Sequence, residues 1–162
     1  MAKRLLFPLI AILLVLSLAS CKREVKMEHC ELGILLPEDF ALHNAEGTFD
    51  LAYSDGELVV GLVRLSYDAA ILDGIPATLT REEFARFYLA ESGKETKGIF
   101  EYGDCHYFTY TEVNGGISYR YTHTFYTTPY AYFVISFISY ESGQWGLEQT
   151  LSLTKSVYLK NI

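Results

Sequence analysis

Residues 104–140, DCHYFTYTEVNGGISYRYTHTFYTTPYAYFVISFISY, contain the pattern from which the architecture follows. Three runs rich in aromatic and β-branched residues, at 104–113, 116–126 and 130–140, are separated by short turns. The dipeptide Asn114-Gly115 between the first two runs is a strong signal for a two-residue hairpin turn. The pattern therefore predicts a three-stranded antiparallel meander.

The turn also predicts a register. With Asn114 and Gly115 as the two loop residues, His106 lies opposite His123 in the neighbouring strand. Because side chains alternate between the faces of a strand, one face of this hairpin is aromatic. The other face carries polar side chains, namely Thr109, Thr111, Arg120 and Thr122.

The last run of the meander is apolar on both faces. One face carries Phe133, Ile135 and Phe137, and the other carries Tyr132, Val134 and Ile138. A strand of this kind lies inside a sheet that is covered on both sides. We therefore expect layers of structure above and below the sheet.

The chain before the meander adds strands and one helix. Residues 32–36 predict a short strand that ends at Pro37, and residues 49–65 predict a hairpin. Thr80 and Glu83 occupy the positions of a capping box, and Gly93 is a typical helix stop, so a helix is expected from Thr80 to about Ser92.

A last helix is predicted from about residue 142 to Lys155, followed by a short end at 157–159. The order of strands, helix, strands and helix is typical of an α+β protein. We expect an antiparallel sheet flanked by helices, an α/β/α sandwich, formed by residues 31–162 as a single domain.

The run Ile34-Leu35-Leu36-Pro37-Glu38-Asp39-Phe40, with the hairpin at 49–65, the middle helix and the final helix entering Lys155-Ser156-Val157, resembles the PsbP-like family. The resemblance spans most of the chain after residue 30. It implies the same flanked antiparallel sheet and a role in binding or assembling other proteins. It carries over no functional residue.

The first twenty residues have the pattern of an export signal. Lys3 and Arg4 precede an apolar run at 5–18, which is too short to span a bilayer. The segment Leu18-Ala19-Ser20-Cys21 resembles a bacterial lipobox. We therefore expect cleavage after residue 20 and lipid on Cys21 as the membrane anchor. Residues 21–30 are expected to form a tether. The domain would then lie on the extracytoplasmic side of the plasma or outer membrane.

The charge of the chain excludes some partners. Lys3 and Arg4 leave with the signal, so 11 of the 13 basic residues remain against 20 acidic ones, a formal net charge of −9. Nucleic acid and anionic lipid are therefore poor partners. Protein or a small ligand is the partner that we expect.

Two cysteines remain after Cys21 is assigned to lipid. Cys30 and Cys105 would face a compartment in which a disulfide persists. Sequence alone does not place their Cα atoms within bonding range, so a bridge and two buried free thiols both stay open.

His106 and His123 are the best metal candidates, because the predicted register puts them opposite each other, with Glu112 farther along that face. Two histidines in an aromatic face also form packed ring pairs, and zinc needs at least one more ligand. Metal motifs, a nucleophile elbow and cofactor fingerprints are missing from the sequence, so we expect neither a cofactor nor catalysis.

Tyrosines crowd the meander. Tyr110, Tyr119 and Tyr121 are expected in the core, whereas Tyr107 and Tyr126, on the threonine-rich face, are equally consistent with core and binding surface. The expected function is a non-catalytic, lipid-anchored binding domain of the cell envelope. The alternative is a metal- or small-ligand-binding protein or enzyme that uses the face of His106 and His123.

Overall fold

A seven-stranded antiparallel sheet forms the centre of the computed structural model, which describes residues 23–45 and 47–160. Its strands lie in the order β3-β4-β5-β9-β8-β7-β6. Their bounds are β3 Ala41–Leu42, β4 Leu51–Ser54, β5 Leu58–Ser66, β6 Phe100–Tyr102, β7 Cys105–Asn114, β8 Ile117–Thr127 and β9 Ala131–Tyr140. The predicted meander is therefore confirmed as β7, β8 and β9.

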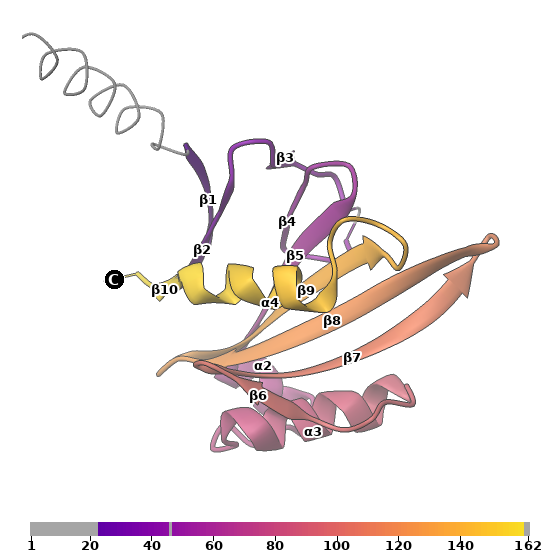
Figure 1. Ribbon diagram of the computed structural model, residues 1–162. Coiled ribbons are helices and arrows are strands. Elements are labelled where there is room, and N and C mark those ends of the chain that lie inside the picture. The colour runs from indigo at the N-terminus through magenta and orange to yellow at the C-terminus, as the bar shows by residue number, and fades with distance from the viewer. Residues whose placement is uncertain (1–22, 46, 161–162) are drawn as a thin grey trace, which may run out of the picture.

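Both faces of this sheet are covered (Figure 1). Helices α2 (Tyr67–Leu72) and α3 (Arg81–Ser92) lie on one face. On the other lie α4 (Leu147–Leu153), the short helix η2 (Thr154–Ser156) and a second sheet of β1 (Glu24–His29), β2 (Leu32–Pro37) and β10 (Val157–Leu159). The predicted α+β class, an antiparallel sheet flanked by helices, is confirmed.

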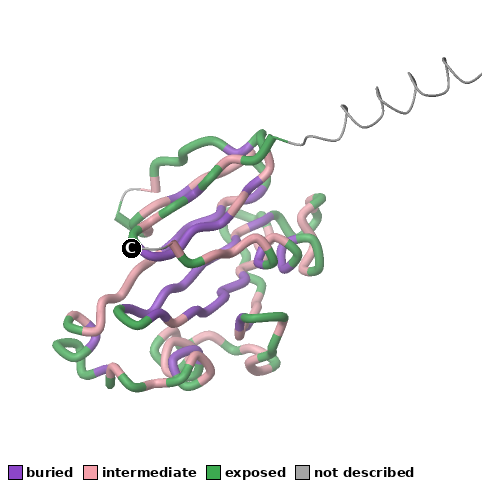
Figure 2. Tube along the Cα trace, turned by 90° about the vertical axis from the view of Figure 1, so that its left-hand side faces the viewer, coloured by how far each residue is buried: buried purple, intermediate pink, exposed green. Residues whose placement is uncertain are grey.

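Strand β9 is the central strand of the large sheet, between β5 and β8. Its first seven residues are all buried, and buried positions run along the middle strands while exposed ones lie in the loops (Figure 2). Phe133, Ile135 and Phe137 pack toward the small sheet, and Tyr132 and Val134 pack toward α3. The two-sided apolar pattern of the sequence is the cause of this arrangement.

Helix α3 begins and ends at the predicted residues. The Thr80 hydroxyl accepts a hydrogen bond from the Glu83 amide (3.3 Å), and the Glu83 carboxylate accepts one from the Thr80 amide (2.8 Å). Gly93 ends the helix with a φ of 63°, a conformation that glycine adopts without a steric penalty.

The predicted register of β7 and β8 is wrong by two residues. Asn114 pairs with Ile117, so Gly115 and Gly116 form the turn, with φ values of 59° and 82°. Two glycines take the positive φ angles of such a turn more easily than asparagine and glycine do. Because the shift is an even number, each side chain keeps its predicted face, but its partner changes.

Residues 24–29 form a strand, so the predicted tether over residues 21–30 is wrong for this part of the chain. Strand β1 pairs with β2 along its whole length. Val25, Met27 and His29 alternate with more exposed charged residues, and Met27 is completely buried. This two-residue period is that of a half-buried strand, and it outweighs the charged composition of the segment.

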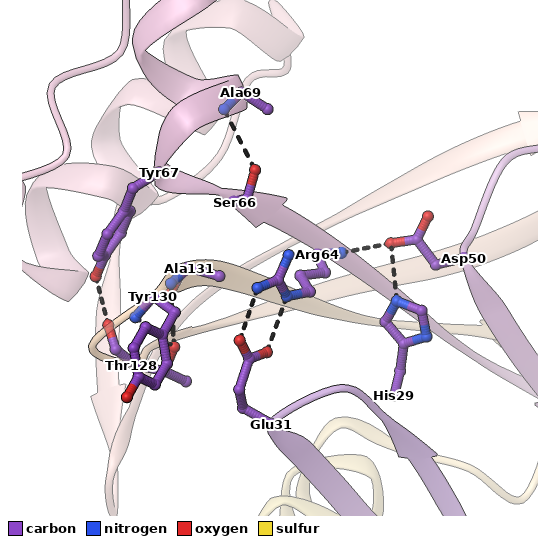
Figure 3. A network of polar contacts seen from close by, with 10 residues as sticks. All are labelled: His29, Glu31, Asp50, Arg64, Ser66, Tyr67, Ala69, Thr128, Tyr130 and Ala131. Carbon is purple, nitrogen blue, oxygen red and sulfur yellow. Dashed lines mark hydrogen bonds and ion pairs between the residues drawn. The ribbon is translucent and has the colours of Figure 1, made fainter. Parts of the chain in front are cut away.

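A polar cluster joins the small sheet to the large one (Figure 3). The Arg64 guanidinium on β5 donates two hydrogen bonds to the Glu31 carboxylate in the turn between β1 and β2, at 2.6 and 2.8 Å. The Asp50 carboxylate accepts from the Arg64 amide (2.7 Å) and lies 3.8 Å from His29. Glu31 is only 7% exposed, so this ion pair is largely shielded from water.

Truncation of Phe137 to alanine tests the two-sided core. The ring is 1% exposed, so we expect Phe137→Ala to lower the free energy of unfolding by about 3 to 5 kcal/mol, measured by urea denaturation. Phe100→Ala is the matched control, because Phe100 is 41% exposed. Equal losses in the two variants would contradict the covered-sheet arrangement.

The Glu31 and Arg64 pair predicts a pH-dependent contribution to stability. Hydrogen bonds from Arg64 hold the pKa of the Glu31 carboxyl below its usual value of 4.5. The stabilisation is therefore complete above about pH 4.5 and is lost as the pH falls through the lowered pKa. We expect Glu31→Gln to cost about 2 kcal/mol at pH 7 and progressively less in acid.

Urea denaturation of parent and Glu31→Gln proteins between pH 3 and pH 7 measures this difference. Glu91→Gln, at an exposed position of α3, is the control. A difference between parent and Glu31→Gln that stays constant with pH would contradict the assignment.

A cleft between the two sheets

A cleft of about 430 Å³ lies where the small sheet meets one end of the large sheet. Its wall on the small sheet comes from Leu32, Val157, Tyr158 and Leu159. The opposite side comes from the turn between β6 and β7, the end of β8, the start of α3 and helix η2, through Arg81, Tyr102, Gly103, Asp104, Cys105, Tyr126, Thr127, Thr154 and Lys155. Segments distant in sequence therefore converge on one small volume.

The floor of the cleft is polar and buried. Tyr126 is 8% exposed, and its hydroxyl lies beside the side chains of Cys105, Thr124 and Thr154 without a well-aligned hydrogen bond in the described residues. The neighbouring Cys105 thiol donates to the Tyr102 carbonyl oxygen (3.2 Å), and the Thr154 hydroxyl donates to the Leu151 carbonyl oxygen (2.6 Å). The Tyr126 hydroxyl is thus surrounded by other polar side chains below the surface of the cleft.

Both titratable groups of the floor are neutral at pH 7. Burial raises the pKa of the Cys105 thiol and the pKa of the Tyr126 hydroxyl above their ordinary values. A neutral hydroxyl both donates and accepts hydrogen bonds. The floor therefore offers a polar contact without a negative charge.

Two cations lie along the cleft without a carboxylate partner. Arg81, the first residue of α3, has a buried Nε atom with no hydrogen-bond partner in the described residues. The Lys155 ammonium on η2 lies 5.7 Å from the centre of the Tyr102 ring. Asp104 is the one carboxylate among the lining residues, so the lining has a net positive charge.

The tyrosine on the small-sheet side is held in place by its neighbours. The Tyr158 hydroxyl donates to the Glu28 carboxylate (2.5 Å). Its ring lies over Gly33, where a Cβ atom would come within 2.5 Å of the ring. Glycine at position 33 is therefore required for this ring position.

This arrangement is suited to binding. Cys105 has no histidine beside it in the cleft, because His106 follows it directly in β7 and points to the opposite face, toward Glu82 of α3. A buried neutral thiol without a base is a poor nucleophile. The cleft presents hydrogen-bonding groups and positive charge.

The structure does not place His106 opposite His123. His106 pairs with Phe125 and His123 with Phe108, because of the two-residue shift in register. The His106 Nε2 atom lies 4.0 Å from the Glu82 carboxylate. The two rings share a face of the sheet, as predicted, but they are diagonal neighbours.

His123 is a core residue. Its Nδ1 atom lies 2.8 Å from the Ser136 hydroxyl, and its Nε2 atom lies 3.5 Å from the Tyr110 hydroxyl. Burial lowers its pKa to about 4, so the ring is neutral at pH 7. Among residues 23–45 and 47–160, histidine, cysteine and acidic side chains form no group of three that could hold a metal. Absence of a bound metal stays a prediction.

The sequence left open whether Cys30 and Cys105 form a bridge, and in the structure both are free thiols. Cys30 is a free, exposed thiol in the turn between β1 and β2, with a φ of 48°. Cys105 is a free, buried thiol in the cleft. The turn carries Cys30 away from the core, so only one of the two thiols is buried.

The sequence left the positions of Tyr107 and Tyr126 open. Tyr126 lines the cleft, and Tyr107 is half-buried against the ring of Phe100 (5.6 Å between ring centres).

The sequence did not indicate Arg81, Thr154 and Lys155 as binding residues. The first turn of α3 reads as a capping sequence, and the end of the last helix reads as a helix terminus. Neither segment carries a local binding signal.

The lipid anchor was predicted at Cys21, which lies outside the described residues. Within the described part of the chain, every helix is too short or too polar to cross a bilayer.

Comparison with known proteins supports the fold. No protein-family model matches the chain, and no curated protein does. A solved structure from Bacteroides thetaiotaomicron VPI-5482 is similar, with a TM-score of 0.60 and 11% identity over 86% of this chain and 49% of that chain. The chain thus spans about half the length of that protein. At this identity the likeness shows the α+β fold alone.

A second solved structure, of LpqN involved in cell envelope biogenesis of Mycobacterium tuberculosis, has a TM-score of 0.44 and 10% identity over 88% of this chain and 94% of that chain. So low a TM-score supports no conclusion about this chain. Membership of the PsbP-like family stays a prediction, since no family model matches.

The unpaired hydroxyl predicts an unusual result for Tyr126→Phe. Loss of a buried hydroxyl without a protein partner should leave the free energy of unfolding unchanged or raise it by about 1 kcal/mol. Tyr132→Phe is the matched control, because its buried hydroxyl donates to the Pro76 carbonyl oxygen (2.6 Å) and accepts from the Leu79 amide (2.9 Å). We expect that variant to lose about 1 to 2 kcal/mol in urea denaturation. A loss of this size in Tyr126→Phe would show that its hydroxyl has a protein partner.

Proposed function

We propose that the protein is a non-catalytic binding protein of the bacterial cell envelope, held on a membrane by lipid on Cys21, with the cleft between its two sheets as the ligand site. The observation that carries this proposal is the cleft of about 430 Å³, whose lining includes two cations without an ion-pair partner in the described residues. A cavity with a few convergent polar groups in a partly apolar lining is typical of a ligand site.

The position of the anchor leaves the cleft open to water. Strand β1 begins at Glu24, three residues after Cys21, and Glu24 pairs with Pro37 at one end of the hairpin. Leu32, which lines the cleft, lies at the other end. Five residue steps at ~3.3 Å separate the two ends by roughly 17 Å. The cleft thus lies at the end of the hairpin that is farther from Cys21 along the chain.

We further propose that the domain is PsbP-like, on the residues at 34–40 and on the order of its helices and strands. That family resemblance implies binding without catalysis, as does the cleft, where no base accompanies the Cys105 thiol. The alternative site at His106 and His123 is not favoured by the geometry, because both ring nitrogens of His123 lie near side-chain hydroxyls.

Saturation-transfer NMR with a set of small soluble fragments tests the cleft. We expect fragments that bind the parent protein to lose their signal in Leu159→Trp, which places a large ring at the mouth of the cleft. Leu159 is 59% exposed, so the fold should tolerate this change. Leu72→Trp, at an 87% exposed position of α2, is the control. Fragments that bind all three proteins equally, or no binding fragment at all, would contradict the proposal.

The lipid anchor predicts the behaviour of Cys21→Ser. Serine lacks the thiol that receives the diacylglyceryl group, so we expect the variant to take up no label when cells grow with a fatty-acid analogue. The parent should carry the label and a mature N-terminus at residue 21. Label retained on the serine variant would contradict lipid attachment at Cys21.

A further inference from the structure

We infer that the ligand of the cleft is a small water-soluble anion with an apolar body, a carboxylate or a phosphate ester, whose charged group contacts Arg81 and Lys155 and whose body lies against the apolar wall and Tyr102. This inference rests on the proposed function and specifies the class of ligand.

The charge of the ligand follows from the two cations of the lining. Of the other described lysines and arginines, Arg64, Arg86, Lys94 and Lys160 form ion pairs, whereas Arg23, Lys26, Lys97 and Arg120 lie outside the cleft and form none. No carboxylate lies within ion-pair distance of Arg81 or Lys155 in the described residues, although the chain has an excess of acidic side chains. An anion in the cleft would supply the missing partner.

The polar atoms without a hydrogen-bond partner indicate where the charged group of the ligand binds. The Arg81 Nε atom is a buried donor without an acceptor, and the Tyr126 hydroxyl is buried without any partner. A carboxylate or phosphate offers several acceptor oxygens and can accept from more than one donor of the lining. A neutral ligand of the same shape has weaker acceptor oxygens and cannot form an ion pair with Lys155.

The rest of the lining sets the body of the ligand. Leu32, Val157 and Leu159 give an apolar wall, and Tyr102 adds an aromatic ring. A volume of about 430 Å³ is near the small end of ligand sites. The body is therefore of the size of a single ring or a short chain, too small for a membrane lipid.

The test compares matched probes on the full-length lipidated protein in nonionic detergent. Phenylacetate is the carboxylate probe, phenylacetamide is its neutral counterpart of nearly the same shape, and phenyl phosphate is the phosphate probe. Isothermal titration gives the Kd of each probe for the parent, Arg81→Gln, Lys155→Gln and Arg86→Gln. Arg86→Gln is the matched control, because Arg86 lies on the same helix but pairs with Glu82 outside the cleft.

We expect one of the two anions to bind the parent at least about ten-fold more tightly than the amide, and Arg81→Gln to remove about that factor. Lys155→Gln should weaken the anions by a smaller factor, and Arg86→Gln should change nothing. A tighter Kd for phenylacetate or for phenyl phosphate assigns the anion as carboxylate or phosphate. Circular dichroism of each variant controls for folding.

Equal binding of acid and amide to the parent would overturn the inference, and so would anion binding that is unaffected by Arg81→Gln. If fragments are blocked by Leu159→Trp while no anion is preferred, the cleft remains the ligand site and only the charge assignment fails. If no fragment binds in the cleft at all, the proposed function fails with it.

Discussion

The structure depends on the burial of strand β9 on both faces. Phe133, Ile135 and Phe137 on one face and Tyr132 and Val134 on the other are at most 3% exposed. Each face must be removed from water, because the burial of such side chains is the main favourable contribution to folding. Helix α3 covers one face, and the small sheet with α4 covers the other. The positions of the helices and of the small sheet follow from the need to cover both faces of β9.

The layer of α3 and the layer of the small sheet pack differently against the large sheet. On the α3 side, the rings of Phe84 and Tyr132 stack at 4.2 Å between centres, and the Tyr132 hydroxyl reaches backbone partners. The small sheet is instead joined to the large one by a polar contact between Glu31 and Arg64, and it leaves a cleft at the strand ends. Of the two buried tyrosines in the described residues, Tyr126 on this side has no well-aligned hydrogen bond, and on the α3 side the same is true of the His106 Nδ1 atom. The cleft is thus a consequence of covering one sheet with another.

Local signals in the sequence predicted local structure well. The capping box of Thr80 and Glu83 lies within one turn of helix, and the apolar pattern of β9 lies within one strand. The register of β7 and β8 was missed by two residues, because the glycine at 116 also takes part in the turn. That small shift is enough to separate His106 from the position opposite His123. Strand β1 was missed because its charged side chains concealed a two-residue period.

The cleft itself was not predictable from one sequence. Leu32, Arg81, Tyr126 and Lys155 come from four separate elements, and none stands in a motif. Chain topology alone brings them together. The most direct test is a crystal structure of the protein purified from the cells that make it. We expect density for a small anion with oxygens about 3 Å from the Arg81 guanidinium and the Tyr126 hydroxyl. A cleft closed by protein side chains that pair with both groups would contradict the account.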